Sequence, residues 1–259
     1  MKNMKTTFAA LALLTLSACA GTPGKGDPRD PLESYNRAVY TFNDKLDQFV
    51  LKPVAKGYDN VLPTVAKTGV RNFFGNLGTV LTMANNALQG KGEDAFSDLG
   101  RFLLNSTFGV AGLFDIATPV GMPQHKEDFG QTLGKWGIGS GPYFVLPFLG
   151  PSTIRDAMAK PLDWQLQYPT HVSDIPVRNS LYALEVIDTR ASLLGASNVL
   201  GEAALDPYVF VRDAYLQRRQ RMVYDGNPPK TDNEFEDDES GDEENGGSAT
   251  NKANDKNGK

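Results

Sequence analysis

Residues 30–49 read DPLESYNRAVYTFNDKLDQF, and this stretch indicates a helical fold. Its apolar residues recur at intervals of three and four, so they form one stripe along an α-helix. Asp30 is expected to cap this helix, Pro31 to occupy its first turn and Pro53 to end it. An ordinary surface helix around an apolar core has the same periodicity. The stripe comprises Leu32, Tyr35, Val39, Phe42, Leu46 and Phe49.

Further segments on the C-terminal side show helical periodicity, and strict alternation of apolar and polar residues is rare. The sequence therefore predicts one mainly α-helical domain over residues 30–224. The 26 glycines and 16 prolines predict many breaks between short elements. The predicted helices are Pro63–Phe74, Thr79–Gln89, Glu93–Thr107, Val177–Leu194 and Asp206–Met222, the last opened by Asp206-Pro207.

The first 18 residues have the features of a cleavable secretory signal peptide. Two lysines precede an apolar segment, Phe8–Leu16, which is too short to cross a bilayer. Leu16-Ser17-Ala18-Cys19 matches the lipobox of bacterial lipoproteins. We therefore expect cleavage before Cys19, the only cysteine, which would carry an N-acyl group and S-diacylglycerol. An ordinary secreted protein with one spare thiol is the alternative.

Residues 19–29 are expected to form a short polar tether between the lipid anchor and the domain. Ala20 follows the cysteine where an inner-membrane retention signal would have Asp, so we expect sorting to the outer membrane. Residues 225–259 contain 11 acids and 4 bases, a formal charge of −7, whereas residues 1–224 contain 20 acids and 22 bases, a charge of +2. This composition predicts a disordered acidic tail and excludes the basic surface of a nucleic-acid binder.

Trp136–Ile154 contains no charged residue. Its four glycines and three prolines argue against a continuous membrane-spanning helix. Two interpretations remain, a loop packed into the core or a re-entrant hairpin beside a channel, since irregular backbone within hydrocarbon must be shielded by protein or line a water-filled cavity. The sequence alone favours the buried loop.

Catalytic and metal-binding patterns are absent from the sequence. The only histidines, His125 and His171, have no metal-ligand spacing and are expected in loops. No G-x-S-x-G or Walker A motif occurs. The pairs Arg155-Asp156 and Asp188/Arg190 suggest structural ion pairs or helix capping, or alternatively the polar lining of a lipid path. We therefore expect no catalytic residues, no metal and no cofactor beyond the lipid on Cys19.

Several motifs in residues 30–221 resemble those of the MlaA/VacJ family of lipoproteins. They occur in the family's order, and the longest of them runs from Asp128 into the uncharged segment. The acidic tail lies outside the shared pattern. The matching motifs are Asp30–Arg37, Phe102–Gly109, Asp128–Gly137, Gly141–Tyr143, Leu146-Pro147, Gly150–Ser152, Arg155-Asp156, Asp188–Ala191, Asp206–Tyr208 and Arg212–Tyr215.

This resemblance implies a ring of amphipathic helices in the inner, periplasmic leaflet of the outer membrane, with a central amphipathic channel. It implies removal of mislocalised phospholipids from the outer leaflet and their transfer to a periplasmic carrier protein, which maintains lipid asymmetry. A trimeric porin is the implied membrane partner, and no enzymatic activity is implied.

If the protein forms such a ring, the uncharged segment is better interpreted as a hairpin that lies beside the channel. Glycine and proline would shape such a hairpin, and arginines are suited to bind phosphate groups. Two other functions stay open, a membrane-associated phospholipid hydrolase or acyltransferase and a purely structural porin-binding lipoprotein. The candidate hairpin residues are Gly137, Gly139, Gly141, Pro142, Pro147 and Gly150, and the candidate headgroup contacts are Arg155, Arg178 and Arg190.

Overall fold

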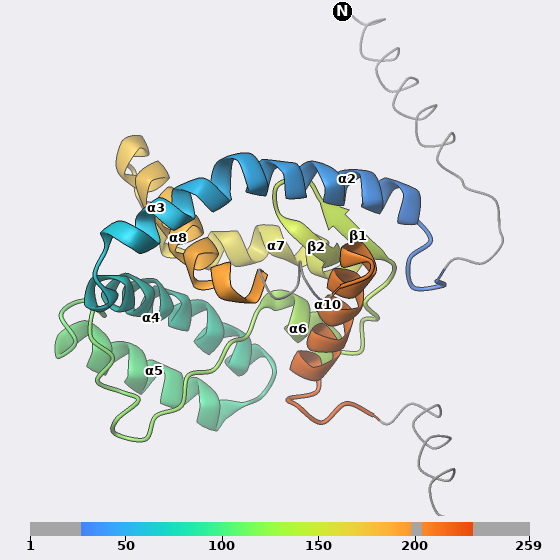
Figure 1. Cartoon of the computed structure of the whole chain (residues 1–259). Helices are drawn as coiled ribbons and strands as arrows, with labels where there is room; N and C mark the ends of the chain where they lie inside the picture. Colours follow the sequence, from blue (N-terminus) through green and yellow to red (C-terminus); the bar gives the residue numbers. More distant parts are fainter. Residues whose placement is uncertain (1–26, 198–203, 230–259) are drawn as a thin grey trace, which may run out of the picture.

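The computed structural model describes residues 27–197 and 204–229 (Figure 1). The chain is mainly helical, as predicted from its periodicity. The expected signal peptide, Cys19, most of the tether and nearly all of the acidic tail lie outside the described residues, so these expectations stay predictions.

The first helical segment is longer than predicted. Helix α2 spans Glu33–Leu46, a π-helical turn η1 spans Asp47–Leu51, and helix α3 spans Lys52–Val61. Together they run across one side of the molecule (Figure 1). The prediction that Pro53 ends the helix was wrong. In the π turn the Lys52 N–H donates to the Asp47 carbonyl, five residues back, and this wider turn lets Pro53 enter α3 at its first turn, where no N–H is needed.

The prediction that Asp30 caps this helix was also wrong. Leu32 precedes α2, and no side chain caps the first turn. Asp30 is buried instead, where its carboxylate accepts hydrogen bonds from the Asn36 amide at 2.7 Å and from the Tyr208 hydroxyl. Arg212 lies 3.5 Å away. Asp30 therefore joins the start of α2 to the C-terminal helix.

Two long antiparallel helices, α4 and α5, form a hairpin at one end of the molecule (Figure 1). Helix α4 spans Thr64–Leu88 and merges the two helices predicted there, because Gly75 and Gly78 do not interrupt it. Helix α5 spans Gly92–Thr107, which confirms the prediction for that segment.

The uncharged segment after helix α6 (Phe129–Lys135) is not a buried loop, and that interpretation was wrong. Residues 136–142 are exposed, and an antiparallel β-hairpin follows, with strand β1 over Tyr143–Leu146 and strand β2 over Gly150–Thr153. Tyr143 pairs with Thr153 and Leu146 with Gly150. The strands have four residues each, so alternation was too short to reveal them. Their tip, residues 147–149, is exposed.

Two asparagines of α2 hold this β-hairpin. The Asn36 amide donates to the Tyr143 carbonyl at 3.1 Å, and its oxygen accepts from the Val145 N–H at 2.8 Å. Asn43, two helical turns later, donates to the Leu146 carbonyl at 2.9 Å and accepts from the Phe148 N–H at 2.8 Å. The two amides thus satisfy the open edge of β1, as a third strand would.

The predicted apolar stripe of α2 faces the same β-hairpin. Tyr35 stacks on Phe144 and Phe42 contacts Phe148 edge-on, each with ring centroids 5.3 Å apart. Phe49 lies beyond the β-hairpin and is 79% exposed. Part of the stripe is therefore partly covered by the β-hairpin, and its end faces outward.

The remaining helices close the fold. Helix α7 spans Ile154–Leu166, a short 3₁₀ turn η2 spans Tyr168–His171, α8 spans Ile175–Ser192 and α10 spans Pro207–Val223. The predictions for α8 and α10 are confirmed to within two residues. Asp206 caps α10 as expected, accepting from the Tyr208 and Val209 N–H groups.

Only a small apolar cluster is buried among the described residues. Tyr143, Val145 and Tyr208 form its centre, and the ring of Tyr143 meets that of Tyr208 edge-on. We call this cluster the aromatic core. Partly buried residues surround it: Val39, Tyr40, Val209, Tyr215 and Leu216.

Candidate functional site: a polar cavity behind an apolar exterior

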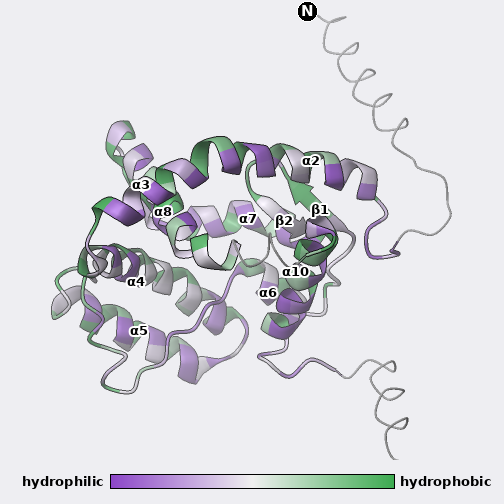
Figure 2. Cartoon of the chain, viewed as in Figure 1, coloured by the Kyte–Doolittle hydropathy of each residue, from purple (hydrophilic) through white to green (hydrophobic). Residues whose placement is uncertain are grey.

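The distribution of polar and apolar residues is inverted relative to that of a water-soluble protein. Among the described residues, 19 polar or charged residues are buried, against eight of the hydrophobic type. Many large apolar side chains are exposed, including Val61, Val65, Phe96 and Phe148, each more than 70%. Figure 2 shows hydrophobic and hydrophilic turns alternating along α2. Such extensive apolar exposure marks a surface that contacts something other than water.

The buried polar residues of α4 form one stripe along the helix. Successive members are three residues apart, and Asn86 follows Asn85, so the stripe winds gradually around the helix while each member stays buried. The threonine hydroxyls donate to carbonyls of the preceding turn, Thr79 to Gly75 at 3.0 Å and Thr82 to Gly78 at 3.3 Å. This polar stripe comprises Asn76, Thr79, Thr82, Asn85 and Asn86.

Helix α5 also carries buried polar residues, namely Asp98, Arg101 and Asn105. The Asn86 amide donates to the Asp98 carboxylate at 2.7 Å. The His125 ring nitrogen lies 2.9 Å from the other Asp98 oxygen. This contact attaches the segment between α5 and α6 to α5. The prediction that His125 lies in a loop is confirmed, and its contact assigns it a structural role. His171, expected in a loop, lies on the exposed 3₁₀ turn and contacts the Gln167 carbonyl.

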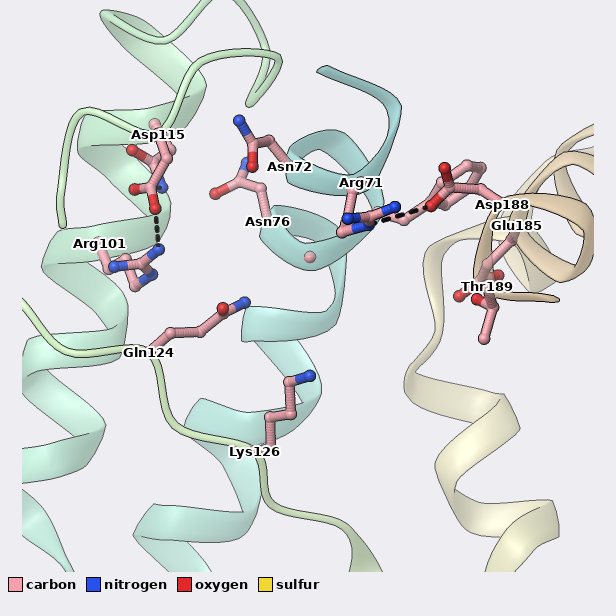
Figure 3. A pocket seen from close by; sticks show the side chains of 13 residues that line it. Arg71, Asn72, Asn76, Arg101, Asp115, Gln124, Lys126, Glu185, Asp188 and Thr189 are labelled. Atoms are coloured by element: carbon pink, nitrogen blue, oxygen red, sulfur yellow. Dashed lines mark hydrogen bonds and ion pairs between the residues drawn. The ribbon is translucent and has the colours of Figure 1, made fainter. Parts of the chain in front are cut away.

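A cavity of about 330 Å³ opens where α4, α5 and α8 meet. Figure 3 shows Arg71, Asn72 and Asn76 projecting from α4, with Arg101 and Asp115 on one side and Glu185, Asp188 and Thr189 of α8 on the other. Gln124 and Lys126 come from the connection that leads into α6. Phe74 is the sole large apolar side chain among the lining residues. We call this the polar cavity.

The wall on the α5 side is rigidly bonded. Buried Arg101 contacts the Asp115 carboxylate at 2.7 Å and donates to the Thr118 hydroxyl at 2.9 Å and the Met122 carbonyl at 2.8 Å. Burial opposes ionisation of Asp115, but hydrogen bonds from Thr118 and the Arg101 guanidinium outweigh it and lower the pKa of Asp115 to about 2. The Asp115 carboxylate is therefore fully ionised at neutral pH.

Asn105 shapes the loop that covers this wall. Its oxygen accepts from the N–H groups of Ile116 and Ala117 at 2.8 and 3.0 Å. Gly112 has φ +89°, and a Cβ there would lie 2.7 Å from Asn76. The loop after α5 thus requires glycine to pass so close to the polar stripe.

The opposite wall is looser. Asp188 of α8 accepts from the Tyr58 hydroxyl at 3.0 Å and lies 3.6 Å from Arg71, whose side chain is half exposed. Burial and this hydrogen bond raise the pKa of Tyr58 to about 12. Burial raises the pKa of Glu185. Within the described part of the chain, no side-chain hydrogen bond or ion pair engages Glu185 or the Lys126 ammonium.

Five of the nine predicted site residues are brought together, but outside the polar cavity. Gly137, Gly139, Gly141 and Pro142 line a second hollow with Arg155, of about 590 Å³, beside α10. Pro147 and Gly150 lie at the tip and the second strand of the β-hairpin.

The three candidate arginines are dispersed. Arg155 pairs with Asp156 at 3.0 Å, and Arg190 holds Asp47 with two hydrogen bonds of 2.6 and 2.7 Å. Arg178 lies in the first turn of α8. None of the three lines the polar cavity. In the sequence, Asn72 and Asn76 lie four residues apart, which places them on one side of α4, and both line the polar cavity.

No helix among the described residues is long and apolar enough to cross a membrane, and those residues contain no group of side chains suited to hold a metal. A family model described as MlaA lipoprotein matches residues 28–222.

The chain belongs to the MlaA lipoprotein family.

MlaA relatives match over most of their length. The intermembrane phospholipid transport system lipoprotein MlaA of Escherichia coli (strain K12) is 38% identical over 86% of this chain and 91% of its own. The MlaA lipoprotein of Haemophilus influenzae is 32% identical over 87% of this chain and 93% of its own length. A solved structure described as "Structural basis for maintenance of bacterial outer membrane lipid asymmetry" matches with a TM-score of 0.66 and 34% identity, over 75% of this chain and 98% of the other.

Proposed function

We propose that this protein removes mislocalised phospholipids from the outer leaflet of the outer membrane and that their headgroups pass through the polar cavity. The observation that carries the proposal is the inverted distribution, with polar residues inside and apolar residues outside. The lipoproteins named above act in intermembrane phospholipid transport, and that role is transferred here to this chain.

Such a route must shield the acyl tails of the lipid from water and its headgroup from hydrocarbon. A phospholipid has about 30 acyl methylenes, so exposure of its tails to water would cost about 24 kcal/mol at about 0.8 kcal/mol each. Its charged headgroup is in turn costly to place in hydrocarbon. Exposed residues such as Val65 and Phe96 offer an apolar surface to tails, while the polar cavity offers hydrogen bonds and charges to the headgroup.

The same distribution supports a position in the periplasmic leaflet of the outer membrane, anchored by lipid on Cys19. Apolar side chains around the body would contact acyl chains directly, so the anchor adds to an interaction that the fold already makes. A trimeric porin as membrane partner and a periplasmic carrier as acceptor complete the proposal, as the family resemblance implies. The chemistry is transport without bond breakage, so neither histidine is given a catalytic role.

Filling the polar cavity tests this proposal. Thr189 is exposed on the cavity side of α8, so Thr189→Trp should block the passage without disturbing a buried contact. We expect phospholipid to accumulate in the outer leaflet, measured by surface labelling of its amines in intact cells. Val186→Trp on the same helix is the matched control, since Val186 is already an exposed apolar residue and does not line the cavity.

Protein levels must be equal in the three strains, as judged by immunoblot. Normal leaflet composition in the Thr189→Trp strain would overturn the assigned passage. Release of fatty acid from labelled phospholipid by the purified protein would instead favour the hydrolase alternative.

A further inference from the structure

The charges around the polar cavity are balanced and separated in space. Three bases and three acids line it, so its formal charge is zero. An anion site of the same size would carry a net positive charge. Figure 3 shows the acids on the α5 and α8 sides, with Lys126 on the connection between them. The six are Arg71, Arg101, Lys126, Asp115, Glu185 and Asp188.

Four of these six charges are already used within the protein. Arg101 and Asp115 neutralise each other at 2.7 Å, and Arg71 lies near Asp188 at 3.6 Å. The remaining two are Lys126 and Glu185, one of each sign, and neither pairs with another described residue. A cavity with one available cation and one available anion is complementary to a ligand that carries both charges.

The position of Lys126 is fixed by its own segment. The Met122 carbonyl accepts from Arg101, the His125 ring contacts Asp98, and the Lys126 carbonyl accepts from the Gln131 amide at 3.2 Å. Three consecutive anchors therefore hold the backbone from which the Lys126 side chain enters the cavity. The ammonium of this exposed side chain makes no hydrogen bond or ion pair within the described residues and suits a phosphate oxygen.

The acceptors on the other side suit a primary ammonium. The Asn76 side-chain oxygen is buried, has no hydrogen-bond partner among the described residues, and belongs to a residue that is 4% exposed. A quaternary ammonium, which cannot donate a hydrogen bond, is usually held by several aromatic faces, whereas Phe74 is the one aromatic residue of this lining. Glu185 on α8 and Asn76 on α4 therefore each offer an acceptor to a group with N–H donors.

We infer that the polar cavity selects phospholipids with a zwitterionic headgroup that ends in a primary ammonium, with Lys126 contacting the phosphate and Glu185 the ammonium. This inference rests on the proposed function, because it names the lipid class for the same passage. Phosphatidylethanolamine has the required chemistry. Phosphatidylglycerol lacks the ammonium group. Phosphatidylcholine has a quaternary ammonium, which carries no N–H donor.

The test is a competition on the full-length lipidated protein in non-ionic detergent. Mixed micelles supply equal amounts of the three lipids, and the lipid retained after washing is extracted and quantified by mass spectrometry. We expect the wild type to retain phosphatidylethanolamine about tenfold over phosphatidylglycerol, the effect of one charge-assisted hydrogen bond. Phosphatidylcholine should be retained less than phosphatidylethanolamine.

Two variants separate the two contacts. Glu185→Gln should bring the ratio of phosphatidylethanolamine to phosphatidylglycerol close to one, because only the first lipid has the ammonium. Lys126→Gln should lower retention of all three lipids and keep their ratio, since each has the phosphate. Glu93→Gln, an exposed acid at the start of α5 and outside the cavity, is the matched control and should behave as the wild type.

Equal retention of the three lipids by the wild type, or an unchanged ratio in Glu185→Gln, would overturn the inference and leave the proposed passage standing. Retention of no lipid by the wild type, together with normal leaflet composition in the Thr189→Trp strain, would overturn both.

Discussion

The aromatic core and the α4–α5 hairpin are held together in opposite ways. In the aromatic core, Tyr143 and Tyr208 pack as in a water-soluble protein, with apolar neighbours around them. Between α4 and α5 the contacts are hydrogen bonds such as that of Asn86 with Asp98, and apolar residues such as Phe96 point outward. The difference shows that burial of apolar surface holds the first region together, whereas hydrogen bonds join the two helices of the second, whose apolar side chains would contact acyl chains in the proposed membrane position.

Replacing a buried amide of the polar stripe should have the largest effect on stability. In Asn86→Leu the Asp98 carboxylate loses its hydrogen bond in a buried site, so we expect a loss of about 2–3 kcal/mol in the free energy of unfolding. Denaturant unfolding in detergent, followed by tryptophan fluorescence, measures it.

The control for this variant is Ala87→Leu, which adds the same apolar group one residue later, at an exposed position. It should leave stability unchanged in detergent. Equal stability of the two variants would contradict the polar interior of the hairpin.

Asp163 on α7 should make the free energy of unfolding depend on pH, and this effect is expected to be intermediate in size. Burial raises its pKa to about 6, against the lowering effect of a 2.8 Å hydrogen bond from the Phe129 N–H. The folded state therefore holds this proton more tightly than the unfolded state, whose pKa is 3.8. The resulting stabilisation is fully present below about pH 4 and is lost as the pH rises through about 6.

Asp163→Asn keeps an acceptor for the Phe129 N–H and removes the titration. The free energy of unfolding of the wild type, measured relative to this variant, should fall between pH 4 and pH 6 and then stay level. Parallel pH profiles for the two proteins would show that Asp163 is not desolvated.

Removing one hydroxyl from the aromatic core should have the smallest effect. The Tyr143 hydroxyl is buried and has no hydrogen-bond partner among the described residues, so Tyr143→Phe is expected to change stability by less than about 1 kcal/mol, toward higher stability. Tyr208→Phe is the contrast, because the Tyr208 hydroxyl bonds to Asp30 and its loss should destabilise the fold. A large loss in Tyr143→Phe would reveal an ordered partner for that hydroxyl.

The helices could be predicted because their periodicity does not depend on what covers the apolar face. α5, α8 and α10 begin and end within two residues of the predicted positions. A hairpin in the uncharged segment was one of the two interpretations, but its two strands and the helix beyond Pro53 could not be predicted, for local reasons. A π turn admits the proline, and side-chain amides of α2 replace a neighbouring strand.

The polar cavity could not be predicted from the apolar pattern, because that pattern assumes an apolar interior. Asn76, Lys126 and Glu185 come from separate elements, and nothing in their local sequence brings them together. Arginine is suited to bind phosphate, and in the structure Arg155 and Arg190 pair with Asp156 and Asp47. Pairing of this kind depends on tertiary structure alone.

The uninterrupted helical run from Glu33 to Val61 has a mechanical consequence. At 1.5 Å per residue it is about 43 Å long, which exceeds the roughly 30 Å of hydrocarbon in a bilayer. With Lys45, Asp47 and Lys52 along its middle it suits an orientation parallel to the bilayer plane. A rod lying flat in a single leaflet enlarges the area of that leaflet alone, so each copy of the protein would impose a bending stress on the envelope around it.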